Sequence, residues 1–200
     1  MDPKALLEAV GTAGLFAIVF AESGILAGFF LPGDSLLFTA GLLASKGILN
    51  LPVVLVGCFL AAVAGDQVGY LFGRRVGPAL FRRPNSRLFH QRNLERAHAY
   101  FDQYGPKTVV MARFLPVVRT FAPVLAGVAR MEYRVFVTYN LVGGLLWSVG
   151  VTMLGYVLGS SIPDIDRYLL PAVLVIVAVS FVPVIREVLK MRAQSSPEQP

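Results

Sequence analysis

Long apolar segments with almost no charged residues occupy most of this 200-residue sequence. A helix needs about 20 apolar residues to cross a hydrocarbon core about 30 Å thick. We predict spanning helices at residues 51–72, 136–158 and 169–185. The composition agrees, because 15% of the residues are charged, whereas soluble domains contain about 25%. A water-soluble fold is nearly excluded, and we expect an all-α integral membrane protein.

A fourth apolar segment covers residues 9–21 and continues through Glu22 into residues 25–31. It is long for one untilted helix and carries a carboxylate, so we predict that it bends and completes a set of four spans. No small-residue cleavage site follows it, and we do not expect a removed signal peptide.

Two further apolar segments, residues 24–47 and 109–129, are interrupted by helix-breaking residues. Proline removes a backbone donor and glycine lowers helix propensity. At membrane depth, a broken helix is tolerated only where it is buried in protein or lines an aqueous cavity. We predict two re-entrant helical hairpins, shaped by Pro32, Gly33, Pro116 and Pro123.

The interrupted segments begin an internal repeat. Phe30-Leu31-Pro32 precedes Ala40-Gly41 and Gly69-Tyr70-x-x-Gly73, and Phe114-Leu115-Pro116 precedes Ala126-Gly127 and Gly155-Tyr156-x-x-Gly159. The interval from Gly41 to Gly69 equals that from Gly127 to Gly155, 28 positions. One hairpin plus one span leaves the next unit upside down, so the repeat is predicted to be inverted, an architecture of transporters.

Basic residues predict the orientation. Seven of the 18 Lys and Arg residues lie within residues 74–96, and the positive-inside rule places this loop in the cytoplasm. Residues 130–134 and 186–192 are also basic and are predicted inside, whereas residues 160–167, with two aspartates, are predicted outside. Both termini are therefore expected in the cytoplasm.

We predict a single membrane domain at residues 1–193 and a disordered tail at residues 194–200. The domain comprises repeat 1 at about 22–75, an amphipathic cytoplasmic segment at about 82–104, repeat 2 at about 105–160 and a final span at about 169–189. The amphipathic segment is predicted from apolar residues at three- and four-residue steps.

Five charged residues lie inside the apolar segments: Glu22, Asp34, Asp66, Arg113 and Arg119. A lone charge at the bilayer centre costs about 2.5–3.5 kcal/mol on insertion scales, so such residues usually face one another or a wet cavity and mark function. An inverted repeat would bring the acids of the first unit opposite the arginines of the second.

We predict that Glu22, Asp34, Arg113 and Arg119 bind substrate and protons. Arginine presents a planar fork that matches phosphate or carboxylate. Burial and a neighbouring guanidinium act in opposite directions on the protonation of a carboxylate. A proton and a substrate anion would then compete for one cluster, which is a hypothesis of proton-linked anion transport.

Several alternatives stay open. In one alternative, Glu22 and Asp34 form structural ion pairs with Arg113 and Arg119 that lock the hairpins together. Asp66 is either functional or paired with a loop arginine such as Arg74. Asn140 and Trp147 are seven residues apart on one span. They either pack or line a cavity, with packing favoured, and they join Asp66 as secondary candidates.

Enzyme, metal and nucleic-acid functions are not expected. The sequence has one cysteine, Cys58, so it offers no disulfide framework or cysteine-based metal site. Both histidines lie in the polar segment between the repeats. Lys107-x5-Arg113-Phe114 has the wrong spacing for a membrane lipid phosphatase. No cofactor is predicted, and the basic residues are explained by topology.

The motifs as a set closely resemble the DedA family, the prokaryotic branch of the VTT or "SNARE-associated" membrane proteins, over residues 6–190. They are Glu22, Phe30-Leu31-Pro32-Gly33-Asp34-Ser35-Leu36-Leu37, Gly65-Asp66-Gln67-Val68-Gly69-Tyr70, Arg113-Phe114-Leu115-Pro116-Val117-Val118-Arg119-Thr120, Ala126-Gly127, Asn140 and Trp147. The resemblance implies two opposed re-entrant hairpins that meet within the membrane. It also implies that Glu22, Asp34, Arg113 and Arg119 fill the family's acidic pair and arginine pair.

The same resemblance implies the substrate. Members of this family are lipid translocases, implicated in recycling undecaprenyl phosphate and in flipping phosphatidylethanolamine, with dependence on the proton-motive force. We expect an undecaprenyl phosphate flippase in the bacterial cytoplasmic membrane. The alternatives are a phosphatidylethanolamine flippase or scramblase, a proton-coupled small-ion antiporter and a non-transporting assembly factor. The sequence leaves the oligomeric state open.

Overall fold

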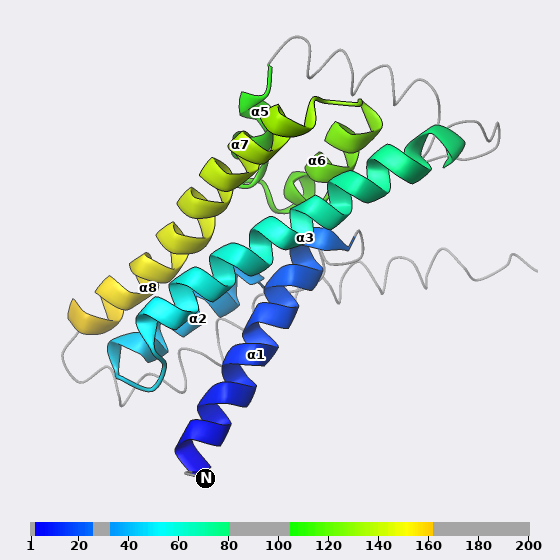
Figure 1. Cartoon of the computed structure of the whole chain (residues 1–200). Coiled ribbons are helices and arrows are strands. Elements are labelled where there is room, and N and C mark those ends of the chain that lie inside the picture. The colour runs from blue at the N-terminus through cyan, green and yellow to red at the C-terminus, as the bar shows by residue number, and fades with distance from the viewer. Residues whose placement is uncertain (1–2, 26–32, 81–104, 162–200) are drawn as a thin grey trace, which may run out of the picture.

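The computed structural model describes residues 3–25, 33–80 and 105–161, and every element within them is helical (Figure 1). The predicted final span, the amphipathic segment at 82–104 and the C-terminal tail lie outside the described residues. The elements are α1 (Pro3–Gly24), α2 (Gly33–Ser45), α3 (Leu51–Leu80), α5 (Lys107–Ala112), α6 (Pro116–Val128), α7 (Tyr133–Gly144), the π-helical turn η2 (Leu145–Val149) and α8 (Gly150–Ser161).

Two stretches are long and apolar enough to cross a membrane, Leu51–Val76 and Tyr133–Ser161. The first lies in α3, which contains the predicted span 51–72 and continues to Leu80. The second combines α7, η2 and α8 and contains the predicted span 136–158. The two central spans are therefore helices where the sequence placed them.

The first helix, α1, ends at Gly24. It lies parallel to α3, since Phe16 is beside Gly57 and Phe20 is beside Gly65, and it ends at Gly24 near the middle of α3. A Cβ on Gly65 would lie 2.6 Å from the Phe20 carbonyl oxygen. Glycine thus lets these two backbones touch. The helix ends two residues after Glu22, where the sequence predicted a bend.

The first helical hairpin consists of α1 and α2. Glu22, near the end of α1, contacts Gly33 at the start of α2, and the other ends meet where Gly11 and Leu15 face Leu43 and Lys46. The two helices are therefore antiparallel. The hairpin predicted within residues 24–47 is therefore wrong in its bounds, because residues 33–45 form the single helix α2, which pairs with α1 instead.

The second hairpin consists of α5 and α6, joined by a turn at Arg113, Phe114 and Leu115. Pro116 begins α6, where its missing N–H group would have no helical partner in any case. Pro123 lies inside α6 and does not end it. Of the two prolines predicted to interrupt this segment, only Pro116 stands at a break.

Each hairpin packs on the long helix of the other half of the sequence (Figure 1). Gly41 of α2 lies against the backbone of Thr152 and Tyr156 in α8. Gly127 of α6 lies against the backbone of Tyr70 and Arg74 in α3. Neither glycine leaves space for a Cβ, so backbone meets backbone at both crossings.

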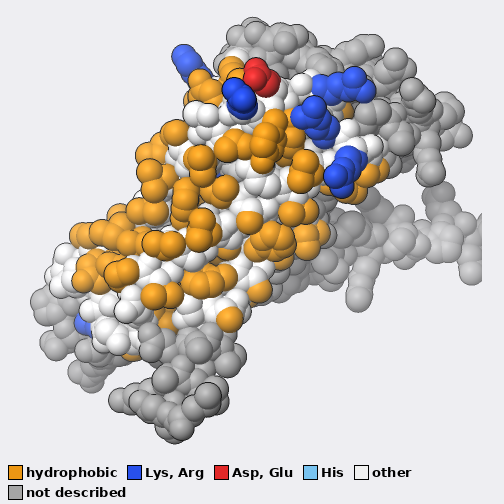
Figure 2. All heavy atoms as spheres, viewed as in Figure 1, with side chains coloured by type: hydrophobic (Ala, Val, Ile, Leu, Met, Phe, Trp, Pro, Cys, Tyr) orange, Lys and Arg blue, Asp and Glu red, His pale blue; other side chains and the backbone are white. Residues whose placement is uncertain are grey.

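The two ends of the bundle differ in charge. Figure 2 shows hydrophobic side chains over most of the described surface on this face, with Lys and Arg gathered at the upper end. Five exposed cations mark the end where α3 stops and α5 and α7 start: Arg74, Arg75, Lys107, Arg130 and Arg134. Tyr70 is buried at this end and donates a hydrogen bond of 2.6 Å to the Met131 carbonyl oxygen.

The start of α1 lies at the opposite end (Figure 1), and Gly11 and Leu15 of α1 share a pocket with the turn between α2 and α3. This placement differs from the prediction, which put the N-terminus on the same side as the basic loop. The prediction differs because it counted the first apolar segment, from its hydropathy, as one full crossing of the membrane. The contacts of α1 with α2 and α3 make it one arm of a hairpin instead.

Candidate functional site

The tips of the two hairpins meet through Arg119, in the first turns of α6. Its Nη1 donates a hydrogen bond of 2.6 Å to Oδ1 of Asp34, the second residue of α2. Its Nη2 donates to Oε1 of Glu22 near the end of α1. One guanidinium therefore bridges two carboxylates from the other hairpin, and we call Glu22, Asp34, Arg119 and Trp147 the tip cluster.

Gly33 makes room for the Glu22 carboxylate. A Cβ at residue 33 would coincide with the Oε2 atom of Glu22, so a side chain there requires the carboxylate to move. The sequence predicted Gly33 as a hairpin-shaping residue. The structure gives it a second, steric reason, while Pro32 lies outside the described residues.

The side chains of the tip cluster differ in their exposure to solvent. The Glu22 side chain is 1% exposed and the Arg119 side chain 10%, whereas the Asp34 side chain is 46% exposed. Within the described part of the chain, Nε of Arg119 has no hydrogen-bond partner. The cluster therefore has an open side at Asp34 and spare capacity for hydrogen bonding.

Trp147 completes the tip cluster from η2. Its Nε1 donates a hydrogen bond of 2.7 Å to the same Asp34 Oδ1 that accepts from Arg119. Its ring centroid lies 4.7 Å from the Arg119 Cζ atom, within the range of a cation–π contact. Trp147 packs in the hydrophobic core, as the sequence favoured, and its indole also touches both Asp34 and Arg119.

Arg113 forms a separate buried cluster. It lies in the turn after α5 and donates hydrogen bonds to Asp66 of α3 and to Asn140 of α7. Side-chain exposure is 5% for both Arg113 and Asp66, and Asn140 is fully buried. Asn140 also donates to the Val63 carbonyl oxygen at 3.2 Å, so this amide binds both neighbours rather than only packing.

The four predicted site residues are thus divided between two clusters. Arg119 takes both Glu22 and Asp34, and Arg113 takes Asp66. The suggestion that Asp66 pairs with a loop arginine is wrong, and Arg74 donates to the Tyr70 hydroxyl instead. Asp66 remains within electrostatic range of Arg119, which makes the two clusters neighbours.

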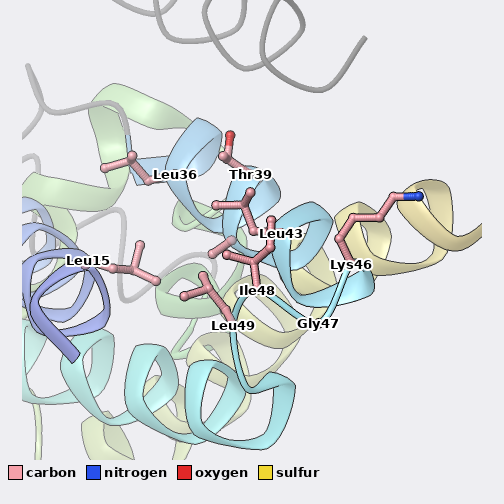
Figure 3. Close-up of a pocket in the computed structure, with 10 residues that line it drawn as sticks. Leu15, Leu36, Thr39, Leu43, Lys46, Gly47, Ile48 and Leu49 are labelled. Carbon is pink, nitrogen blue, oxygen red and sulfur yellow. The ribbon is translucent and has the colours of Figure 1, made fainter. Parts of the chain in front are cut away.

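An apolar cavity of about 610 Å³ lies between α1, α2 and the turn to α3 (Figure 3). Its lining is aliphatic except for Thr39 and Lys46, and it includes none of the tip cluster. Leu36, two residues after Asp34, lines the cavity. Hydrocarbon-lined space therefore begins within one helical turn of the exposed carboxylate.

Among the described residues, no group of three or more His, Cys, Asp or Glu side chains is placed to hold a metal ion.

Comparison with known proteins decides the family. A model of the VTT domain matches residues 31–157, and Protein DedA of Escherichia coli K12 is 43% identical over 178 residues, covering 88% of this chain and 81% of that protein. The chain belongs to the DedA family of membrane proteins. The resemblance seen in the motifs is confirmed.

Other DedA-family relatives are also named as membrane proteins. An uncharacterized membrane protein of Mycobacterium leprae is 44% identical over 183 residues, covering 92% of this chain and 82% of the relative. The inner membrane protein YqjA of Escherichia coli K12 is 38% identical over 149 residues, covering 74% and 67%. No solved structure matches the chain.

Proposed function

We propose that this DedA-family protein moves the anionic head group of a lipid, undecaprenyl phosphate, across the bacterial cytoplasmic membrane in a step linked to the proton-motive force. The observation that carries the proposal is Arg119, which bridges Glu22 and Asp34 where the hairpins meet. We assign the chain a transport role and no enzymatic activity.

In the proposed mechanism, substrate phosphate and protons exchange places at Arg119. A phosphate group can replace both carboxylates because the guanidinium fork binds either anion bidentately. Protonation of Glu22 and Asp34 removes their charge and frees the N–H groups of Arg119 for phosphate. Arg119 then never stays unpaired, which matters because an uncompensated buried charge costs several kcal/mol. Deprotonation of the carboxylates would return Arg119 to them and release the lipid.

The two clusters would have different roles. Asp34 is the exposed member of the tip cluster, so the phosphate would approach Arg119 from that side. Arg113 is enclosed by Asp66 and Asn140 and would position the α5–α6 turn rather than bind substrate. The apolar cavity lined by Leu36 and other aliphatic side chains of the same hairpin supports a substrate with a hydrocarbon portion.

We further propose that the two halves form an inverted repeat in the membrane. The reciprocal packing of α2 on α8 and of α6 on α3, through equivalent glycines, supports this arrangement. The basic end would face the cytoplasm by the positive-inside rule. In this orientation the start of α1 faces outward, and each hairpin enters from a different side. Discontinuous helices that meet at the midplane suit alternating access.

Reconstituted vesicles test the function. Purified protein is placed in liposomes that contain labelled undecaprenyl phosphate, and the label accessible on each leaflet is followed with and without a pH gradient. We expect gradient-dependent exchange with the native protein, loss of exchange for Arg119→Ala, and loss of the gradient dependence for Glu22→Gln. Arg134→Ala, at the exposed basic end, serves as the control and should retain exchange.

The same vesicles separate the alternatives. Unchanged leaflet accessibility with folded native protein would refute the undecaprenyl phosphate proposal. Exchange of labelled phosphatidylethanolamine in its place would assign another lipid, and proton-coupled flux of a small ion without lipid exchange would indicate an antiporter. Stable Arg119→Ala protein with normal exchange would show that the tip cluster is structural.

A further inference from the structure

The long helix of the second half contains one π-helical turn, η2, at Leu145–Val149. Such turns are rare and frequent at functional sites. Gly143 and Gly144 precede this turn. The buried Ser148 hydroxyl donates a hydrogen bond of 2.8 Å to the Gly144 carbonyl oxygen. The turn is therefore supported locally, and it carries the one tryptophan in the sequence.

Trp147 contacts Arg119 without occupying the Nη1 and Nη2 atoms that bind the carboxylates. The Arg119 Cζ atom lies over the Trp147 ring, while Nη1 and Nη2 donate hydrogen bonds to Asp34 and Glu22. Trp147 is 3% exposed and packs in a core with Leu15, Val19 and Leu37. Its ring is thus fixed by apolar neighbours, independently of what the guanidinium edge binds.

We propose that Trp147 is a positioning residue that holds the Arg119 guanidinium over its ring while the Nη groups exchange carboxylate for lipid phosphate. This inference rests on the proposed function and adds a binding element to it. The hydrogen bond from the indole Nε1 to Asp34 turns that carboxylate toward Arg119 in the state without substrate. The charged groups that surround the contact are Glu22 from α1, Asp34 from α2 and Asp66 from α3.

Two substitutions separate the ring face from the N–H group. Trp147→Phe keeps an aromatic face for Arg119 and loses the hydrogen bond to Asp34, whereas Trp147→Leu loses both. Without the ring, the Arg119 side chain must be ordered when phosphate binds, which lowers affinity by about two- to tenfold. We therefore expect Trp147→Leu to bind lipid phosphate up to about tenfold more weakly. Trp147→Phe should remain within about threefold of the native protein.

The matched control is Phe136→Leu, on the same continuous helical stretch. Phe136 is fully buried and stacks on Tyr70 with ring centroids 4.4 Å apart, away from the tip cluster. This substitution also removes a buried aromatic ring, so it reproduces a general loss of packing. It should lower thermal stability without changing the affinity for lipid phosphate.

The experiment measures equilibrium binding of labelled undecaprenyl phosphate to full-length protein in detergent, with elution volume and thermal unfolding as checks of folding. Weaker binding by Trp147→Leu, with Trp147→Phe and Phe136→Leu near native, supports the inference. Equal affinity for all folded variants overturns it while leaving the proposed function intact. Binding with this pattern but no exchange in vesicles supports the role of Trp147 and refutes transport. Absence of binding by native protein overturns both.

Discussion

Arg119 and Asp34 are 85 positions apart in the sequence and are joined by a hydrogen bond of 2.6 Å between Nη1 and Oδ1. The bond connects the first turns of two helices, α6 and α2, that belong to different hairpins. A charge pair at this junction gives the hairpin tips a contact whose strength depends on protonation and on competing anions. This dependence is what a carrier of anionic lipid needs.

Replacement of Arg119 by lysine tests whether the fork geometry matters. An ammonium keeps the charge, but it does not present two parallel donors or a planar face to Trp147. We expect Arg119→Lys to fold and to exchange undecaprenyl phosphate at least about tenfold more slowly, because charge-assisted bonds are worth about 1.5–3 kcal/mol. Leaflet exchange in vesicles measures this, with Arg134→Lys as the exposed control. Native rates for Arg119→Lys would mean that charge alone suffices.

The Arg113 cluster predicts a stability effect that one further substitution reverses. Asp66→Asn leaves the charge of Arg113 without its partner, and breaking a buried ion pair costs about 3–5 kcal/mol. Replacing both residues, Asp66→Leu with Arg113→Met, removes both charges and should restore much of the lost stability. Thermal unfolding in detergent measures both variants. A double variant less stable than Asp66→Asn would contradict the assignment of these residues as a self-contained pair.

The glycines at the helix crossings should tolerate no side chain. Gly155 lies against the Phe38 carbonyl oxygen, so Gly155→Val forces α8 away from α2 and should destabilise the protein by about 1–3 kcal/mol or more. Gly150 starts the same helix with nothing within 4 Å of its Cβ position. Gly150→Ala should therefore be neutral, or more stable by up to about 1 kcal/mol through helix propensity. Expression and thermal unfolding compare the two, and equal behaviour would argue against backbone contact at Gly155.

Cysteine labelling tests the proposed orientation. The native Cys58 is buried, and Cys58→Ala provides a background without thiols. Ile48 in the turn between α2 and α3 is 53% exposed, and Arg134 is exposed at the basic end. In intact cells, a membrane-impermeant maleimide should label Ile48→Cys and spare Arg134→Cys. Both should react in lysed membranes, and the reverse pattern in intact cells would invert the orientation.

Much of the fold followed from local pattern. The two central spans were predictable because an apolar run of this length has few alternatives to a helix. The break at Pro116 was predictable because proline fits the first turn of a helix and not its interior. Pro123 shows the limit of that rule, since tertiary contacts of α6 with α3 outweigh one lost donor.

The sequence predicted which residues make up the candidate site, but not which of them pair with each other. Charges inside apolar segments identified Glu22, Asp34, Asp66, Arg113 and Arg119. Nothing in the sequence distinguishes which arginine meets which acid, since the ends of both hairpins carry arginine or carboxylate. Trp147 and Asn140 were ranked lower because aromatic and amide side chains on an apolar helix usually pack. Their seven-residue spacing on one span was the available signal.

The sequence alone determined that the chain is helical, belongs in a membrane and carries charges that need partners, because hydropathy, helix breakers and the cost of burying charge are local properties. The tertiary structure decided that α1 is a hairpin arm, that Arg119 bridges Glu22 and Asp34, and that Arg113 pairs with Asp66. These pairings depend on where glycines let backbones touch, such as Gly24 against Gly65 and Gly41 against Thr152. Such contacts are set by the approach of distant helices, which no single segment encodes.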